Sequence, residues 1–90
     1  MRVRLDSDFL KKLKKANVKV RKKFLQQILI FQRNPYDPIL RNHELHGEWE
    51  GYRSINITSD WRALYEELKN GDEIIAYFSY IGTHKELYGW

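Results

Sequence analysis

The strongest constraint on the fold is an alternating stretch that runs from Gly51 to Tyr65. Polar and apolar side chains alternate from Tyr52 to Thr58, and the alternation resumes from Trp61 to Tyr65 after the polar pair Ser59-Asp60. Successive side chains of a strand point to opposite faces, so a period of two is typical of a β-strand. Two such runs joined by a short polar pair predict a β-hairpin.

Two helices are predicted before this hairpin. Asp6-Ser7-Asp8 is a polar helix start, because its short side chains cap the backbone and its acids favour the positive end of the helix dipole. Helical spacing of apolar residues then continues to about Ala16, and a second helix is expected from about Lys19 to about Arg33. Asn34-Pro35 ends it, since the residue before a proline avoids the helical conformation.

The remaining segments complete the predicted elements. Met1 to Leu5 is expected to form a strand at or near a sheet edge, and the very hydrophobic run from Ile74 to Ile81 a strand in the sheet interior. The Asn70-Gly71 pair before that run predicts a second hairpin. Residues 35–47 are expected to form a connecting loop, and residues 83–90 a tail with one helical turn capped by Thr83.

The order β-α-α-β-β-β predicts an α+β fold with a single domain over residues 1–90. An N-terminal strand and a helical hairpin are expected on one face of a mainly antiparallel four-stranded sheet. The other face is expected to be open. A chain of 90 residues is long enough for one modest hydrophobic core.

The charge is unevenly distributed. Residues 1–34 carry eleven basic and two acidic residues, a net charge of +9, and residues 35–90 carry five basic and ten acidic residues, a net charge of −5; these sum to the +4 of the chain. Eight of the sixteen basic residues lie between Lys11 and Lys23. In most proteins such a run covers a solvated helix surface, but its density here points equally to a phosphate-bearing partner.

Composition excludes several classes of site. The chain has no cysteine, which rules out a disulfide framework and a thiolate metal site. No apolar run approaches the ~18 residues of a membrane span, and the N-terminus lacks the apolar core of a signal peptide. A cytoplasmic protein without a membrane partner is therefore expected. His43 and His46 lack the spacing of a helical zinc motif, so neither a metal site nor a cofactor is predicted.

Three motifs carry a resemblance to a known family. They are His43-Glu44-Leu45-His46-Gly47, then Gly51-Tyr52-Arg53 followed by Asp60-Trp61, then Gly82-Thr83-His84 followed by Leu87-Tyr88. In this order and spacing they resemble the RelE/ParE toxin superfamily, specifically its YafQ-like branch of ribosome-dependent mRNA interferases. The resemblance spans almost the whole chain. It implies a RelE-like fold, cleavage of mRNA on the ribosome, and a cognate antitoxin partner from a type II toxin–antitoxin system.

RNA cleavage without a metal ion requires few groups. A base removes the proton of a 2′-hydroxyl, the oxygen attacks the adjacent phosphate, and an acid protonates the departing 5′-oxygen. The products are a 2′,3′-cyclic phosphate and a 5′-hydroxyl. Imidazole suits either role, because its unperturbed pKa of ~6.5 lies near neutral pH.

The resemblance suggests which residues supply these groups. It implies that His84 supports the leaving group and that Asp60 is a catalytic acid or base. The alternatives are an ordinary surface histidine at position 84 and an aspartate at position 60 that only favours the turn. His43 is expected to bind RNA, to act as the base, or only to close its loop. Trp61 and Tyr88 match aromatic positions of the family and are expected to stack on bases or shape the site, with packing in the core or at its rim as the alternative.

Arg53 and Arg62 are the expected phosphate clamps, because a guanidinium group pairs bidentately with phosphate oxygens. Arg53 shares a strand face with two isoleucines, so a partly buried structural role is the alternative. YafQ-like toxins usually carry another histidine where this chain has Asn56, and asparagine transfers no proton at neutral pH. The base is then Asp60 or His43, or activity is reduced. Two other functions remain open: ParE-like inhibition of DNA gyrase, and an inactive relative that only binds antitoxin.

Overall fold

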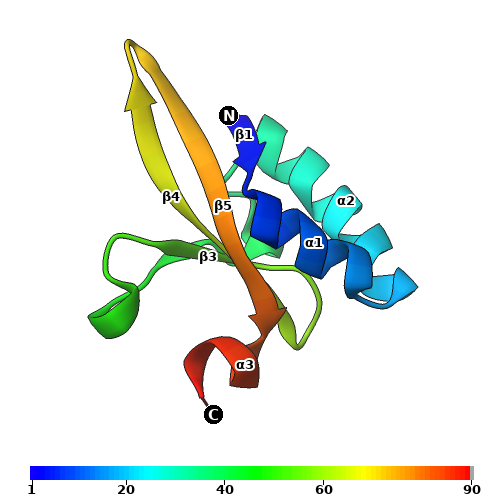
Figure 1. Cartoon of the computed structure of the whole chain (residues 1–90). Coiled ribbons are helices and arrows are strands. Elements are labelled where there is room, and N and C mark those ends of the chain that lie inside the picture. The colour runs from blue at the N-terminus through cyan, green and yellow to red at the C-terminus, as the bar shows by residue number, and fades with distance from the viewer. Residues whose placement is uncertain (90) are drawn as a thin grey trace.

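The computed structural model describes residues 1–89, in which two helices lie beside a twisted sheet (Figure 1). The elements in chain order are β1 (Arg2–Leu5), α1 (Ser7–Lys15), α2 (Val18–Arg33), the short 3-10 turn η1 (Pro38–Leu40), β2 (His43–Glu44), a second turn η2 (Gly47–Trp49), β3 (Arg53–Asn56), β4 (Trp61–Asn70), β5 (Glu73–Thr83) and α3 (His84–Tyr88). Trp90, the end of the expected tail, lies outside the described residues.

The sheet has five strands in the order β1-β5-β4-β3-β2. The edge strand β1 pairs in parallel with β5, and the other neighbours are antiparallel. The predicted α+β architecture is confirmed, but the expectation of four strands is wrong. The additional strand is β2, in which His43 pairs with Ser54 and Glu44 pairs with Arg53. A polar strand of two residues has no periodicity that a sequence pattern could reveal.

Local capping determines the helix boundaries. The Asp6 carboxylate accepts a hydrogen bond from the Asp8 N–H at 3.0 Å, and the Asn17 side chain accepts one from the Val20 N–H at 3.0 Å. These bonds satisfy amide groups that the first helical turn leaves unpaired. The second helix ends at Arg33, and Asn34 caps it before the proline. The predicted helix ends are therefore confirmed to within one or two residues.

The core lies between the helices and one face of the sheet. Its aromatic centre consists of Phe9 from α1, Phe24 and Phe31 from α2, Tyr65 from β4 and Phe78 from β5. Neighbouring rings in this group have centroids 4.9–6.0 Å apart, in tilted or edge-to-face geometry. Such contacts add to the burial of apolar area and fix the helices on the sheet.

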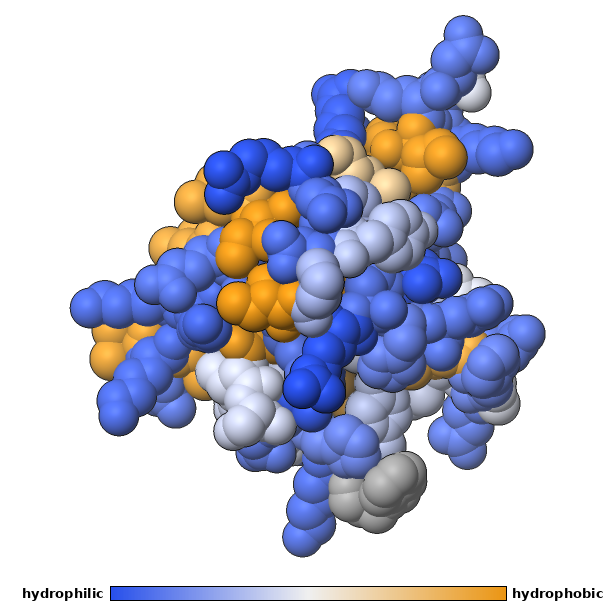
Figure 2. All heavy atoms as spheres, turned by 180° about the vertical axis from the view of Figure 1, so that it is seen from behind, coloured by the Kyte–Doolittle hydropathy of each residue, from blue (hydrophilic) through white to orange (hydrophobic). Residues whose placement is uncertain are grey.

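The opposite face of the sheet is not fully open. The centroid of the Trp49 ring, in η2, lies 4.9 Å from that of the Tyr80 ring and 5.8 Å from that of the Tyr52 ring. The loop that contains η2 therefore folds back over the strands. Seen from behind, the surface is mostly hydrophilic, with separate hydrophobic patches on the side of the helices and near the hairpin tip (Figure 2). Within residues 1–89, the structure contains no helix with the length and apolar character needed to cross a membrane.

The hairpin between β4 and β5 is longer than the alternation predicts. It extends to the pair Asn70 and Glu73, so that Gly71 and Asp72 form its two-residue tip. Gly71 has a φ of +65°, a conformation that a glycine adopts without steric cost. The second predicted hairpin is thus confirmed, with glycine at the first central position of the turn, as in type II′ hairpins.

Candidate functional site

A cavity of about 480 Å³ opens on the sheet face opposite the core, where β3, β4 and α3 meet. Its lining residues come from the loop before β2 and from β2, β3, β4 and α3: Arg41, Asn42, His43, Asn56, Arg62, His84 and Tyr88. None of these residues is acidic. Two guanidinium groups, two imidazoles and two amides give a surface dominated by hydrogen-bond donors and positive charge. A cavity of this composition favours an anionic ligand such as a phosphodiester.

Helix α3 brings His84 to the cavity. Thr83 and Glu86 form a capping box: the Thr83 hydroxyl accepts from the Glu86 N–H at 3.1 Å, and the Glu86 carboxylate accepts from the Thr83 N–H at 2.8 Å. This backbone hydrogen bond, with a smaller effect from Lys12, lowers the pKa of Glu86. The His84 N–H donates to the Asp60 carbonyl oxygen at 2.8 Å. The start of α3 is therefore tied to the β3–β4 turn.

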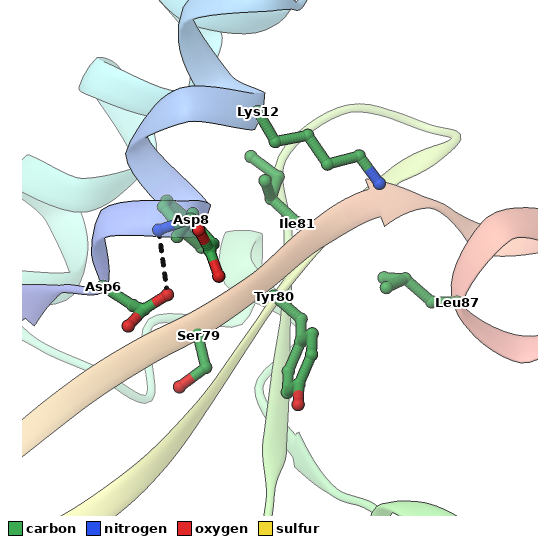
Figure 3. Close-up of a pocket in the computed structure, with 8 residues that line it drawn as sticks. Asp6, Asp8, Lys12, Ser79, Tyr80, Ile81 and Leu87 are labelled. Atoms are coloured by element: carbon green, nitrogen blue, oxygen red, sulfur yellow. Dashed lines mark hydrogen bonds between the residues drawn. The ribbon is translucent and has the colours of Figure 1, made fainter.

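Glycine at position 82 permits a close approach between α1 and α3. A Cβ atom there would lie 3.0 Å from Lys12 Nζ and 3.3 Å from Glu86 Oε1. Lys12 reaches over the strand from α1, with Leu87 on the other side (Figure 3), and its Nζ lies 3.5 Å from Glu86 Oε2. Because both side chains are partly exposed, the ion pair itself adds little stability. It does connect the histidine-bearing helix to the body of the protein.

Figure 3 shows a second cavity, of about 330 Å³, beside this contact. It lies between α1, β5 and α3, and its lining contains Asp6, Asp8 and Ser79 but no histidine or arginine. The Asp6 carboxylate caps α1 and also accepts a hydrogen bond from the Tyr77 hydroxyl at 2.8 Å. The bond from Tyr77 lowers the pKa of Asp6. None of the site residues predicted from the sequence lines this cavity.

Tyr88 closes one side of the first cavity. The centroid of its ring lies 4.6 Å from that of the His84 ring, at an interplanar angle of 69°, and its hydroxyl lies 3.3 Å from Ser54 Oγ. Trp49 Nε1 donates to the Leu87 carbonyl oxygen at 3.2 Å. The far end of α3 is therefore attached both to β3 and to the loop that contains η2.

The position of His43 defines its tautomer. Its Nδ1 lies 2.9 Å from the Arg41 carbonyl oxygen. A carbonyl oxygen only accepts, so Nδ1 carries the hydrogen, and in the neutral ring Nε2 has the lone pair. His43 is thus arranged to accept a proton at Nε2. Arg62 and Asn56, which also line the cavity, form a cross-strand pair, and the buried Gln27 amide donates to the Asn56 carbonyl oxygen at 2.9 Å.

Three of the predicted site residues do not line the cavity. Asp60 is exposed in the turn, where its main chain holds His84. Trp61 is partly buried and packs against the hydrophobic core. Arg53 Nε donates to Asn42 Oδ1 at 2.9 Å, and its Cζ lies 5.4 Å from the centroid of the Tyr36 ring.

Besides Asn56, which stands where YafQ-like toxins usually carry a histidine, two lining residues were not predicted from the sequence, Arg41 and Asn42. Arg41 is the only Lys or Arg in residues 35–47 and stands two residues before His43. Its closeness to His43 in the chain was the one feature of the sequence that could have indicated Arg41 as a site residue. Nothing in the pattern indicates that the loop turns Arg41 toward the histidines, because this depends on contacts with β3 and β4.

Comparison with known proteins identifies the family. A family model described as "Bacterial toxin of type II toxin-antitoxin system, YafQ" matches residues 1–89. The chain belongs to the YafQ toxin family. A curated YafQ relative, the mRNA interferase toxin YafQ of Escherichia coli (strain K12), is 34% identical over 67 residues, which cover 74% of this chain and 68% of the relative.

Solved structures of YafQ and related toxins agree with this assignment. YafQ in the E. coli DinJ–YafQ complex has 30% sequence identity and a TM-score of 0.64, and the match covers 99% of this chain and 100% of that chain. A YoeB/ParE toxin from Agrobacterium tumefaciens has 20% identity and a TM-score of 0.73 over 93% of this chain and 99% of that chain, which supports the fold alone. The resemblance to RelE/ParE toxins and their YafQ-like branch is confirmed.

Proposed function

We propose that this YafQ-family chain is an endoribonuclease that cleaves mRNA, as the name of its E. coli relative states for that protein. The observation that carries the proposal is the acid-free cavity, in which His43 and His84 stand among arginine and asparagine side chains. A phosphodiester supplies the negative charge that this cavity lacks, and two imidazoles are sufficient for proton transfer in both directions.

The reaction proceeds by metal-independent attack of the 2′-hydroxyl. His43 Nε2 accepts the 2′-hydroxyl proton, and the oxygen forms a bond to the adjacent phosphorus. The bond from phosphorus to the 5′-oxygen breaks, and His84 donates a proton to that oxygen. Cationic side chains stabilise the charge of the phosphorane. The reaction leaves a 2′,3′-cyclic phosphate and a 5′-hydroxyl, with no change in oxidation state.

The remaining predicted residues have narrower roles in this proposal. The Tyr88 ring, which borders the cavity beside His84, stacks on a base or ribose of the bound RNA. Arg62 contributes cationic charge. Asp60 holds His84 through its main chain, and its carboxylate is the alternative base if His43 is dispensable. Trp61 acts by packing the turn against the core.

The ribosome is the proposed site of cleavage, which requires a cytoplasmic location. Support comes from the basic surface of α1 and α2, because the segment from Lys11 to Lys23 contains eight of the sixteen basic residues and no acidic one. Ribosomal RNA presents a dense phosphate surface to such a segment. The single toxin domain is proposed to act there without a cofactor.

Primer extension on mRNA from translating cells tests the cleavage proposal. Discrete cuts within translated codons are expected after induction of the wild-type chain. His84→Ala is expected to reduce them by roughly 10²–10⁴-fold, since a positioned acid contributes about that factor. His84→Gln keeps a hydrogen-bonding group without a transferable proton and is expected to be similarly inactive. Growth arrest with intact mRNA and blocked DNA supercoiling would instead indicate gyrase inhibition.

A cognate antitoxin is the proposed protein partner. Solved structures of the E. coli DinJ–YafQ toxin–antitoxin complex provide the precedent. The basic helices of this chain favour an acidic or amphipathic antitoxin segment. Co-expression with a small protein from the neighbouring reading frame is expected to suppress toxicity and to yield a co-purifying complex. If the chain is an inactive relative, it would bind the antitoxin but would cause no toxicity when it is expressed alone.

A further inference from the structure

Arg41 has an unusual backbone conformation. Its φ of 49° and ψ of 43° are left-handed, and it is the only non-glycine residue with a positive φ among residues 1–89. Side chains other than glycine seldom adopt this conformation, and it persists where neighbouring contacts hold it. Here it ends the turn η1 and directs the chain into β2, so that both Arg41 and His43 border the cavity.

Asn42 is the residue that holds this loop. Its Nδ2 lies 2.9 Å from the Pro35 carbonyl oxygen and 2.7 Å from the Tyr65 hydroxyl, and its Oδ1 accepts from Arg53 Nε at 2.9 Å. Tyr65 is completely buried. Both ends of the Asn42 amide are therefore used, and they connect the loop to the core and to β3.

The two arginines of the cavity differ in the donors that remain for a ligand. Arg62 Nη1 lies 3.1–3.2 Å from three carbonyl oxygens, those of Thr58, Ser59 and Trp61, and its Nη2 lies 3.2 Å from the Ser59 oxygen. A guanidinium group has five N–H donors, so most of the Arg62 donors face the turn. The Arg41 side chain has no hydrogen bond or ion pair within residues 1–89, and all of its donors remain available.

We propose that Arg41 binds a backbone phosphate of the RNA in this cavity, and that Asn42 and Arg53 are positioning residues that hold Arg41 in place. The inference rests on the proposed RNA substrate and changes the expected assignment of phosphate contacts. Arg53, the predicted clamp, contributes through Asn42 and not through the RNA. Arg62 stabilises the turn and supplies charge, and Arg41 makes the bidentate contact.

Binding of a short RNA strand with methylated 2′-hydroxyls tests this assignment, because such a strand cannot be cleaved by 2′-hydroxyl attack. Arg41→Ala is expected to weaken binding at least about tenfold. It is also expected to make the slope of log affinity against log salt less steep by about 0.7, the value for one lost phosphate contact on a single strand. Arg41→Lys is expected to retain the slope with lower affinity, since it keeps the charge without the planar fork.

Arg4→Ala is the matched control. Arg4 is an exposed arginine on β1, at the opposite edge of the sheet from β2, and it is likewise without a hydrogen bond or ion pair in the described part of the chain. It is expected to change neither affinity nor salt slope. Equal effects of Arg4→Ala and Arg41→Ala would overturn the inference, as would wild-type affinity and slope in a folded Arg41→Ala variant.

A double-mutant cycle tests the positioning role of Arg53. Arg53→Ala is expected to weaken RNA binding in the wild-type chain but to have almost no effect in an Arg41→Ala chain, because both act on one contact. A direct phosphate ligand at Arg53 would lower the salt slope in both backgrounds and would refute this role. Asn42→Ala is expected to behave as Arg53→Ala does.

Cleavage in translating cells and binding of the methylated strand together distinguish failure of the Arg41 contact from failure of the proposed nuclease activity. Codon-internal cuts by both wild type and Arg41→Ala at equal rates would reject the Arg41 contact and retain the endonuclease. Arg41-dependent RNA binding without any cuts in translating cells would retain the contact and reject the endonuclease.

Discussion

At the scale of single residues, His43 and His84 are held in different ways. The His43 ring is oriented by the hydrogen bond from Nδ1 to the Arg41 carbonyl oxygen. The His84 ring packs edge-on against the Tyr88 ring at the start of α3. The first arrangement leaves a lone pair at Nε2, as a base requires. The His43 geometry is consistent with its proposed role as the base.

Substitution of His43 tests its proposed role as proton acceptor apart from its hydrogen bond to Arg41. His43→Asn is expected to keep a donor near the Nδ1 position, and thus the bond to Arg41, while it removes the proton acceptor. Cleavage is expected to fall by roughly 10²–10⁴-fold with RNA binding retained. The measurement is the rate of mRNA cleavage by the purified protein on programmed ribosomes, beside binding of the methylated strand. Wild-type cleavage by His43→Asn would transfer the base role to Asp60.

Asn56 provides a second residue-scale prediction. Its side chain lines the cavity, whereas the contact with Gln27 uses only its main-chain oxygen. Asn56→His is therefore expected to preserve the fold. With His43 as the proposed base, the cleavage rate is expected to change by less than about tenfold, which corresponds to ~1.4 kcal/mol in the barrier. A much larger increase would show that this chain lacks an efficient base.

At the scale of elements, α3 is too short to be stable alone and depends on its attachments. Its first turn is closed by the Thr83–Glu86 capping box, and its last turn is held by Trp49 through the Leu87 carbonyl oxygen. Because His84 and Tyr88 both belong to this helix, its docking determines the shape of the cavity.

The docking of α3 is expected to weaken in acid. The hydrogen bond from the Thr83 N–H lowers the pKa of Glu86 below its ordinary value of 4.5. A carboxylate with a lowered pKa stabilises the folded state fully above the unfolded pKa and loses this effect as the pH falls through the folded pKa. Proximity contacts between the Trp49 ring and Leu87 in NMR spectra report the docking of α3, and they are expected to persist from about pH 7 to about pH 5 and to weaken below ~4.5.

Glu86→Gln is the control for this titration. Glutamine also completes a capping box, so α3 is expected to remain docked without the acidic transition. Glu86→Ala removes the capping bond and the contact with Lys12, and it is expected to loosen α3 and to lower cleavage at neutral pH. An unchanged acidic transition in Glu86→Gln would mean that another group is responsible.

At the scale of the whole molecule, the aromatic core holds the helices and the sheet together. Phe31 is 0% exposed and contacts both Tyr65 and Phe78. Phe31→Ala is expected to cost roughly 3–5 kcal/mol, against a total stability of about 5–15 kcal/mol for a typical domain. Leu29, 61% exposed on the same helix, is the control, and Leu29→Ala is expected to change stability by less than ~0.5 kcal/mol. Urea unfolding followed by circular dichroism measures both values.

The sequence by itself determined most elements of this protein. Both helices, the first helix cap and two hairpins follow from signals within a few residues: Asp6 at the first helix start, the alternation around Tyr52–Thr58, and the glycine at position 71. The role of Asn17 as the cap of α2 was not predicted. These features depend on local hydrogen bonds and on the period of the apolar side chains. The family resemblance also pointed to His43 and His84, both of which line the cavity.

The tertiary structure alone decided which side chains meet. The strand β2 exists because His43 and Glu44 pair with β3, and the same pairing brings Arg41 to the cavity. Arg53 has a composition and spacing that suit a phosphate clamp, yet its partner is Asn42. Contacts between a loop and side chains distant in the chain depend on tertiary packing, which no local pattern encodes. The composition of the cavity, and with it the chemistry of the protein, is a property of the folded chain.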